Sequence, residues 1–303
     1  MSFTTGVLSR TLATSAARAK INEFVVVGCG LMGAGVAQVG AQVGQKVTLV
    51  DLDDKLLAKA EVRINESVKR VAKKLHKDDA AGKEAFVDAT LGNIAYSTTV
   101  DKGLETADLL LEAVTENMAL KQKLFRAWDA AAPAKTILAS NTSMLSIAEI
   151  TRDVARLDRV GGLHFFNPVP VMKLLEVVRI AETSDDTFDA MVEWGKALCK
   201  TTVACKDTPG FIVNRLLVPL MGEAVKMVER GDASFKDVDT AMKLGAGHPM
   251  GPFELMDYTG LDLHAAICEN EDNPLLEPSP LIRSYVDAGK LGRKSGEGFY
   301  KYE

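Results

Sequence analysis

Cysteine is scarce in this sequence of 303 residues. No pair among the four cysteines has the spacing of a metal site or of a disulfide framework, so we expect free thiols, a reducing compartment and no bound metal. No run approaches the roughly 18 consecutive apolar residues that a membrane-spanning helix needs. Long basic runs are also missing and the net charge is −5, which gives no indication of a nucleic-acid partner. These absences predict a soluble globular protein.

Acidic residues are missing from the first twenty positions, and the first one is Glu23. The same segment contains Arg10, Arg18, Lys20 and seven serines or threonines. This composition is typical of a mitochondrial transit peptide, and a disordered tail without function is the alternative. The remaining length exceeds one ordinary domain, so we expect two.

A short apolar segment, residues 24–27, leads into a turn whose glycines have the spacing of a dinucleotide-binding motif. Gly28 allows a tight turn, Gly30 lets a pyrophosphate approach the backbone, and Gly33 lets the next helix pack closely on the strand. The N–H groups at the N-terminus of that helix, which begins with Leu31 and Met32, face the phosphates. The segment predicts a cofactor site at residues 28–33.

An acidic residue follows the second predicted strand, residues 46–50. Asp51 lies 18 residues beyond Gly33. A carboxylate at this place accepts a hydrogen bond from the adenine ribose 2′-hydroxyl and repels a 2′-phosphate. The sequence therefore predicts NAD, and not NADP, as the cofactor.

Strand and helix patterns alternate as far as residue 140, with further strands expected at residues 108–114 and 136–140 and a helix at residues 120–131. This alternation predicts an α/β fold, a Rossmann-type, doubly wound and mainly parallel sheet. Ligands of such sheets lie at the carboxyl ends of the strands, where residues 115–117 and 140–143 stand. Polar turns with helix N-caps are the alternative interpretation of both segments.

A long amphipathic helix is predicted over residues 55–77, with its apolar stripe at Leu56, Ala60, Ile64, Val68, Val71 and Leu75. The opposite face carries Ser67, Lys69, Arg70, Lys73 and Lys74. Such a face is commonly only solvated, and the alternative is that it meets the phosphates of a second ligand.

Two apolar runs flank a proline-containing turn in residues 160–178. If the chain folds back about Pro170, His164 and Glu176 are each six residues from the pivot and lie opposite one another. An imidazole and a carboxylate in this arrangement form a base and the group that orients it, as catalysis requires. A structural histidine in a salt bridge is the alternative.

The pattern after Ser184 predicts helices, and we place the domain boundary at Asp207. Residues 21–207 then form the NAD-binding domain and residues 208–303 an all-helical C-terminal domain. In the first helix of the C-terminal domain we predict Pro209 in the first turn, Asn214 one turn further on and a kink at Pro219. Ser234 and Asp237 are predicted to cap the next helix, and Pro252 and Pro280 to lie in the first turns of later helices. The tail at residues 292–300 is predicted to pack back onto the body.

Several of these segments together resemble the short-chain L-3-hydroxyacyl-CoA dehydrogenases of fatty-acid β-oxidation, in their mitochondrial form. The resemblance extends from about residue 23 to residue 302, and its most specific segments surround His164 and Asn214. It implies oxidation of an (S)-3-hydroxyacyl-CoA to the 3-ketoacyl-CoA with NAD⁺, in the mitochondrial matrix. It also implies a homodimer formed through the C-terminal domain.

The resemblance assigns roles to individual residues. His164 takes the hydroxyl proton, Glu176 stabilises the imidazolium, and Ser143 and Asn214 bind the reacting oxygens. The implied cofactor contacts are Glu116, Lys121, Ser143, Asn167 and Lys294, and the implied CoA contacts are Ser67 and Lys74.

Two other functions stay open at this point. A dehydrogenase of the same architecture acting on a free hydroxy acid or a sugar acid has no need for the cationic helix at residues 67–74. A non-enzymatic NAD-binding protein, such as a lens crystallin of the same superfamily, has no need for the pair of His164 and Glu176.

Overall fold

The computed structural model describes residues 20–269 and 279–303, and the chain divides into two compact units. Unit 1 contains the described residues up to Thr142 and Ile147–Lys206, and unit 2 contains Ser143–Ser146 and Asp207–Glu303. Apart from Lys20, the transit peptide predicted for residues 1–20 lies outside the described residues. No helix among the residues described is long and apolar enough to cross a membrane.

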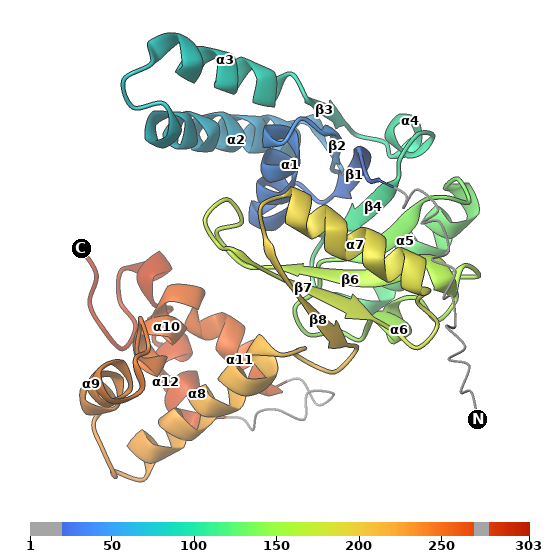
Figure 1. Ribbon diagram of the computed structural model, residues 1–303. Helices are drawn as coiled ribbons and strands as arrows, with labels where there is room; N and C mark the ends of the chain where they lie inside the picture. The colour runs from blue at the N-terminus through green and yellow to red at the C-terminus, as the bar shows by residue number, and fades with distance from the viewer. Residues whose placement is uncertain (1–19, 270–278) are drawn as a thin grey trace, which may run out of the picture. The chain divides into compact units, whose positions relative to one another are not determined.

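Unit 1 is built on one sheet, which has eight strands within the described residues, in the order β3-β2-β1-β4-β5-β6-β7-β8 (Figure 1). All neighbouring strands are parallel except β6 and β7, which form an antiparallel pair. The strands are β1 Glu23–Val27, β2 Lys46–Val50, β3 Ile94–Ser97, β4 Leu109–Glu112, β5 Ile137–Ser140, β6 Val160–Phe165, β7 Leu174–Arg179 and β8 Thr201–Lys206.

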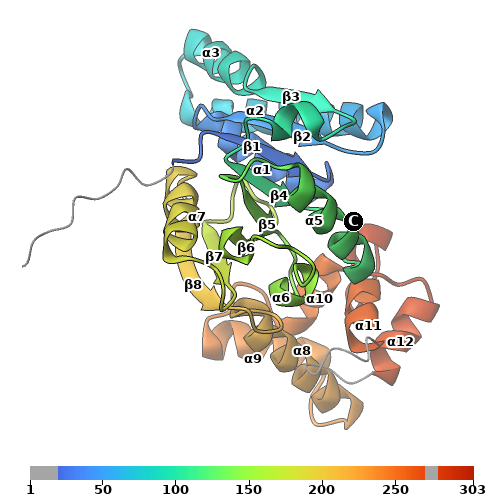
Figure 2. The ribbon, with the colours of Figure 1, turned by 90° about the vertical axis from the view of Figure 1, so that its right-hand side faces the viewer.

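Helices separate the parallel strands, and this confirms the doubly wound Rossmann-type prediction. Helices α2 and α3 run side by side as a hairpin (Figure 2), and α7 crosses a face of the sheet (Figure 1). The helical segments are α1 Leu31–Gln42, α2 Asp54–Leu75, α3 Ala80–Leu91, α4 Asp101–Leu104, α5 Met118–Ala131, α6 Ile147–Ile150, the 3₁₀ turn Leu157–Arg159 and α7 Asp185–Ala197.

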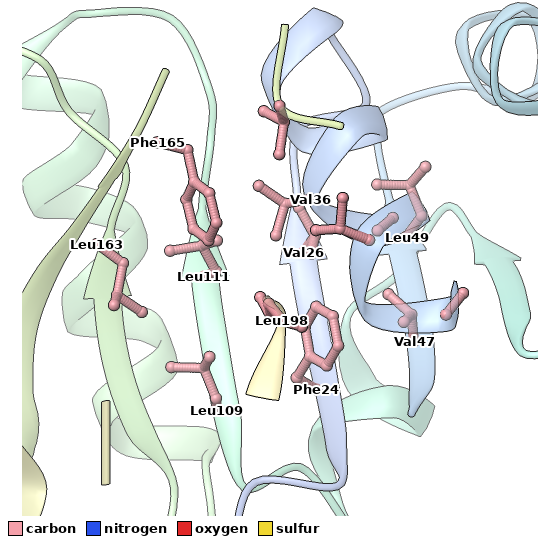
Figure 3. Close-up of a cluster of buried hydrophobic side chains, with 14 of the residues drawn as sticks. Phe24, Val26, Val36, Val47, Leu49, Leu109, Leu111, Leu163, Phe165 and Leu198 are labelled. Atoms are coloured by element: carbon pink, nitrogen blue, oxygen red, sulfur yellow. The ribbon is translucent and has the colours of Figure 1, made fainter. Parts of the chain in front are cut away.

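Alternate side chains of the strands pack against α1, α2 and α7 in one hydrophobic core. Phe24 and Val26 of β1 meet Leu109 and Leu111 of β4 in this core (Figure 3). Leu198, which follows α7, reaches the same cluster. The core thereby fixes the strand ends, where the functional residues were predicted.

Two predictions for unit 1 were wrong in detail. The buried stripe of α2 is Leu57, Ala60, Ile64, Val68 and Ala72, whereas Leu56 and Leu75 are exposed. After Ser184 the chain does not form helices alone, because β8 follows α7. This strand lies at the edge of the sheet and is half exposed, so it lacks the apolar run by which buried strands are found.

Unit 2 is helical, as predicted. Ser234 caps α9 by accepting a hydrogen bond from the Asp237 N–H, and Pro252 and Pro280 occupy first-turn positions. Pro209 does not: α8 begins four residues later, so Asn214 is its second residue, and Pro219 lies inside it. The helices are α8 Val213–Glu229, α9 Phe235–Ala246, α10 Pro252–Thr259, α11 Leu261–Glu269 and α12 Pro280–Asp287, followed by the 3₁₀ turn Arg293–Ser295.

The C-terminal tail packs back onto unit 2, which confirms the prediction for residues 292–300. The carboxylate of Asp257 on α10 accepts hydrogen bonds from the backbone N–H groups of Phe299 and Tyr300, at 2.9 Å each. The Tyr302 hydroxyl donates to the same carboxylate at 2.8 Å. Phe299 is buried among the helices, so the tail is part of the core of this unit.

Candidate active site

The glycine turn between β1 and α1 has the geometry that its sequence predicts. Gly28 has a φ of 103°, in the left-handed region, and a Cβ there would lie 2.4 Å from the Ala113 carbonyl oxygen. A Cβ at Gly33 would lie 1.8 Å from the Gly28 carbonyl oxygen, so the helix contacts the turn directly. At Gly30, by contrast, a Cβ would meet no protein atom within 4 Å. Gly28 and Gly33 are thus packed against protein atoms, whereas Gly30 leaves room for a ligand.

The N-terminus of α1 is suited to an anion. No side chain caps it, and its first turn contains no acidic residue. The helix dipole and the first N–H groups therefore favour a negatively charged group at this end. Leu31 is exposed and Met32 is half-buried beside the turn. This combination fits a dinucleotide pyrophosphate lying over the exposed side of Gly30.

Asp51, at the end of β2, is held against the glycine turn. One carboxylate oxygen accepts a hydrogen bond from the Cys29 N–H and the other from the Leu52 N–H, both at 2.7 Å. Burial alone would raise the pKa of Asp51, but hydrogen bonds from the Cys29 thiol and from these N–H groups lower it below its usual value. The Cys29 thiol, which is buried and faces this carboxylate, has a pKa raised to about 12. Asp51 thus carries a fixed negative charge beside the turn.

An ionic network lies at the ends of β4 and β5, in which Glu112 and Lys121 are buried and Glu116 is exposed. The Lys121 ammonium on α5 is 2.6 Å from the Glu112 carboxylate and 3.1 Å from that of Glu116. Glu112 also accepts a hydrogen bond from the Ser140 hydroxyl, and Glu116 accepts one from Thr142. The network unites the two polar segments that follow these strands. It brings together Glu116 and Lys121, two of the predicted cofactor contacts.

His164 and Glu176 face each other in the antiparallel ladder of β6 and β7, in the register predicted from their spacing. The Nδ1 atom of His164 is 2.7 Å from Oε2 of Glu176, and both side chains are almost fully buried. The Phe166 ring packs against the imidazole at 4.5 Å between ring centres. In the tautomer in which Nδ1 donates to the carboxylate, Nε2 is the basic nitrogen. The pair can therefore accept a proton and stabilise the resulting imidazolium.

Two further candidates meet within unit 2. The side-chain amide of Asn214 donates to the backbone carbonyl of Ser143 at 3.2 Å. Ser143 belongs to the short segment 143–146, whose Ser146 hydroxyl donates to Asp207 at 2.7 Å. This segment directly follows Thr142, at the carboxyl end of β5. Ser143 and Asn214 are both half-buried, with polar groups suited to binding oxygen atoms.

The remaining predicted residues are Asn167, Lys294, Ser67 and Lys74. Asn167 is exposed in the loop between β6 and β7, and Lys294 forms an ion pair with Asp262 in unit 2. On α2, Ser67 is half-buried and Lys74 is exposed. Among the residues that the structure describes, no group of three or more histidine, cysteine or acidic side chains is arranged to hold a metal ion.

The sequence did not single out Glu112 or the role of Cys29. Glu112 is fully buried and forms three hydrogen bonds, one each with the Val114 N–H, Lys121 and Ser140. An acidic residue at the end of an otherwise apolar strand is a signal that could have found it, because a buried carboxylate needs a partner. Cys29 gave no such signal, because nothing in its sequence position indicates that its N–H and its thiol both contact Asp51.

Comparison with known proteins gives matches over nearly the whole chain. Residues 23–208 match the family model of the 3-hydroxyacyl-CoA dehydrogenase NAD-binding domain, and residues 210–302 match that of the 3-hydroxyacyl-CoA dehydrogenase C-terminal domain. The chain is 54% identical to a probable 3-hydroxyacyl-CoA dehydrogenase of Caenorhabditis elegans, over 97% of each chain. It is 50% identical to the human mitochondrial hydroxyacyl-coenzyme A dehydrogenase, over 97% of this chain and 96% of the human protein.

Solved structures agree with these matches. The crystal structure of (S)-3-hydroxybutyryl-CoA dehydrogenase from Ralstonia eutropha has a TM-score of 0.85 and 40% sequence identity, and covers 94% of this chain and 100% of that one. The likeness includes both the sheet domain and the helical domain.

Proposed function

Because this chain belongs to the 3-hydroxyacyl-CoA dehydrogenase family, we propose that it oxidises (S)-3-hydroxyacyl-CoA to 3-ketoacyl-CoA, with NAD⁺ as acceptor, in fatty-acid β-oxidation. Bound NAD⁺ would supply the hydride acceptor. The observation that carries the chemical part of the proposal is the buried pair of His164 and Glu176, at 2.7 Å.

His164 is the general base of the proposed reaction. Its Nε2 takes the proton of the C3 hydroxyl as the hydride leaves the same carbon, and it returns the proton in the reverse direction. Glu176 fixes the imidazole tautomer and stabilises the positive charge that the ring acquires. Ser143 and Asn214 bind the reacting oxygens, which keeps the hydroxyl directed at the base.

Backbone geometry and one carboxylate bind the cofactor. The exposed side of Gly30 and the uncapped N-terminus of α1 accept the pyrophosphate, with Gly28, Leu31, Met32 and Gly33 forming the turn. Asp51 accepts the hydrogen bond of the ribose 2′-hydroxyl, which favours NAD over NADP. The further contacts proposed toward the cofactor are Glu116, Lys121, Ser143, Asn167 and Lys294.

Ser67 and Lys74 on α2 are the proposed contacts of the CoA moiety. Replacing Lys74 by glutamine should raise the KM for acetoacetyl-CoA about fivefold, since an exposed charge contact contributes ~1 kcal/mol or less. Lys102→Gln, which removes an exposed lysine of α4, is the matched control and should leave the KM unchanged. Equal KM values in all three proteins would contradict the assignment of this helix.

The substrate class is tested by comparing (S)-3-hydroxybutyryl-CoA, its R enantiomer and free (S)-3-hydroxybutyrate, with NADH formation as the readout. We expect turnover of the S thioester and little of the other two. Faster use of the free acid would instead support a hydroxy-acid dehydrogenase of the same fold. Tight NADH binding without turnover, over 3-hydroxyacyl-CoA thioesters of different chain lengths, would support a non-enzymatic protein.

The proposed location is the mitochondrial matrix, with residues 1–20 as the transit peptide. The supports are the basic, acid-free composition of this segment and the mitochondrial names of relatives such as the human enzyme. Deleting residues 2–20 from a fluorescent fusion should abolish mitochondrial import. Unchanged import would refute the targeting role.

A further inference from the structure

Lys200 is a buried lysine whose ammonium group binds two backbone carbonyls. It is 9% exposed, and its Nζ donates to the carbonyl of Val169 at 2.5 Å and to that of Met172 at 2.7 Å. Burial lowers its pKa below the usual lysine value. A buried charge destabilises the folded protein unless polar groups compensate for its lost hydration. The hydrogen bonds to these two carbonyls provide that compensation for the Lys200 ammonium.

Both carbonyls belong to one compact loop, residues 166–173, between β6 and β7. Within this loop the N–H groups of Val171 and Met172 donate to the Pro168 carbonyl, at 2.9 and 3.0 Å. The residue after Lys200 adds a third attachment, because the Thr201 N–H donates to the Lys173 carbonyl at 2.7 Å. The start of β8 therefore holds the loop at three carbonyls.

The same loop packs on the helix of the glycine turn. Val169 is buried, and a Cβ at Gly35 of α1 would lie 2.8 Å from the Val169 Cβ. The loop carries Asn167, which is exposed, and its two ends continue into the strands of His164 and Glu176. Lys200 thus holds a loop that connects the proposed base to the cofactor helix.

We propose that Lys200 is a positioning residue of the active site, which clamps loop 166–173 against α1 and so fixes Asn167 for cofactor binding. Methionine, which is apolar and one atom shorter, would fill most of the space without binding the carbonyls. The part of the proposal that concerns NAD rests on the proposed role of Asn167, whereas the clamp itself does not.

The test uses the full-length enzyme with Lys200→Met and the control Lys196→Met, which removes an exposed lysine of α7. Hydrogen exchange of ligand-free protein should accelerate about tenfold at Val171 and Met172 in Lys200→Met, since the loop opens locally. The Kd for NADH, measured by fluorescence titration, should rise about fivefold. The pH profile of turnover should keep its midpoint, because the ladder between β6 and β7 still pairs His164 with Glu176.

Unchanged exchange in a folded Lys200→Met protein would overturn the clamp, and so would equal acceleration in Lys196→Met. If Lys200→Met does not fold, Lys200→Gln carries the same test, because its amide is neutral and one atom too short to bind both carbonyls as the ammonium does. Wild-type exchange and NADH affinity in that variant would contradict the proposal. Lys200→Arg should recover much of both properties. Asn167→Ala tests the cofactor role of Asn167 separately from the clamp. Unchanged NADH affinity in this variant would refute the cofactor role and would not affect the evidence for the clamp.

Discussion

Buried ionisable side chains in this protein are held by specific partners. Lys121 lies between Glu112 and Glu116, His164 is paired with Glu176, and Lys200 binds backbone carbonyls. Removing one member of such a group leaves the other buried without compensation, which is usually more damaging than replacing both. The activity of variants at these positions should therefore be interpreted together with their measured free energy of unfolding.

His264 on α11 predicts a pH dependence of stability in unit 2. Burial lowers the pKa of this histidine from 6.5 to about 4, and its Nε2 is 2.8 Å from the Thr259 hydroxyl oxygen. Between pH 6.5 and about pH 4, His264 binds a proton in the unfolded chain but not in the folded chain. The folded state therefore loses stability as the pH falls through this range. From pH 7 to pH 5 the loss from this group should be about 2 kcal/mol.

Urea unfolding at pH 7 and pH 5 measures this loss in the wild type and in His264→Gln. The variant should lose about 2 kcal/mol less than the wild type between the two pH values. His248→Gln, which removes another histidine of unit 2, is the control and should behave like the wild type. The same pH dependence in His264→Gln and the wild type would show that this histidine is not buried in its neutral form.

Two glycines of the turn between β1 and α1 are expected to have different roles: Gly33 matters for stability, and Gly30 matters only for cofactor binding. Gly30→Ala adds a methyl group where no protein atom lies within 4 Å, whereas in Gly33→Ala the methyl group lies 1.8 Å from the Gly28 carbonyl oxygen. We expect Gly30→Ala to keep the wild-type Tm and to bind NADH at least about tenfold more weakly, because the methyl group enters the pyrophosphate space. Gly33→Ala should lower the Tm as well.

Calorimetry and NADH titration of both variants check this expectation. A Gly30→Ala protein with wild-type NADH affinity would show that the cofactor does not approach the turn at this residue. A wild-type Tm in Gly33→Ala would show that α1 does not pack as closely on the turn as the geometry requires.

The elements that sequence reasoning found are those with a strong local signal. Buried strands such as β1 and β4 are apolar runs bounded by glycine or polar residues, and Ser234 marks a helix start through its capping interaction. Helix α3 and strand β8 were missed. The apolar residues of α3 that pack on the core, Phe86, Val87 and Leu91, show no clear helical period, and β8 is an exposed edge strand. Pro209 fits a first helical turn, but the chain makes another turn there before α8 begins.

The site was predictable to the extent that spacing along the chain determines contact. The distances of His164 and Glu176 from Pro170 were enough to predict their register. Ser143 and Asn214 are 71 residues apart, and their contact depends on how unit 2 folds, so only the family resemblance indicated them. Lys200 and Glu112 look like ordinary members of their segments until their burial is known.

At the scale of the whole molecule, we propose a homodimer formed through the C-terminal domain. Unit 2 exposes large apolar side chains, among them Leu244 at 84% and Leu216 at 69%. Apolar surface of this kind is enriched at the core of homodimer interfaces. Sedimentation equilibrium should give twice the chain mass of 32.6 kDa.

The double variant Leu216→Glu and Leu244→Glu should shift the protein toward the monomer, because two charges would be buried in the interface. Val62→Glu, at a 59% exposed position of α2, is the control and should stay dimeric. A wild-type protein that sediments as a monomer at micromolar concentration would refute the dimer. A double variant that remains fully dimeric would show that these two leucines lie outside the interface.

The proposed reaction uses residues of both units: the cofactor turn and His164 belong to unit 1, and Asn214 belongs to unit 2. The role of His164 as the general base is tested most directly by the rate of NADH-linked reduction of acetoacetyl-CoA in His164→Gln. His248→Gln is the control, and the Kd for NADH is measured on each protein. We expect kcat to fall about 10²-fold or more in His164→Gln alone, with NADH affinity unchanged. Undiminished turnover in His164→Gln would contradict this role.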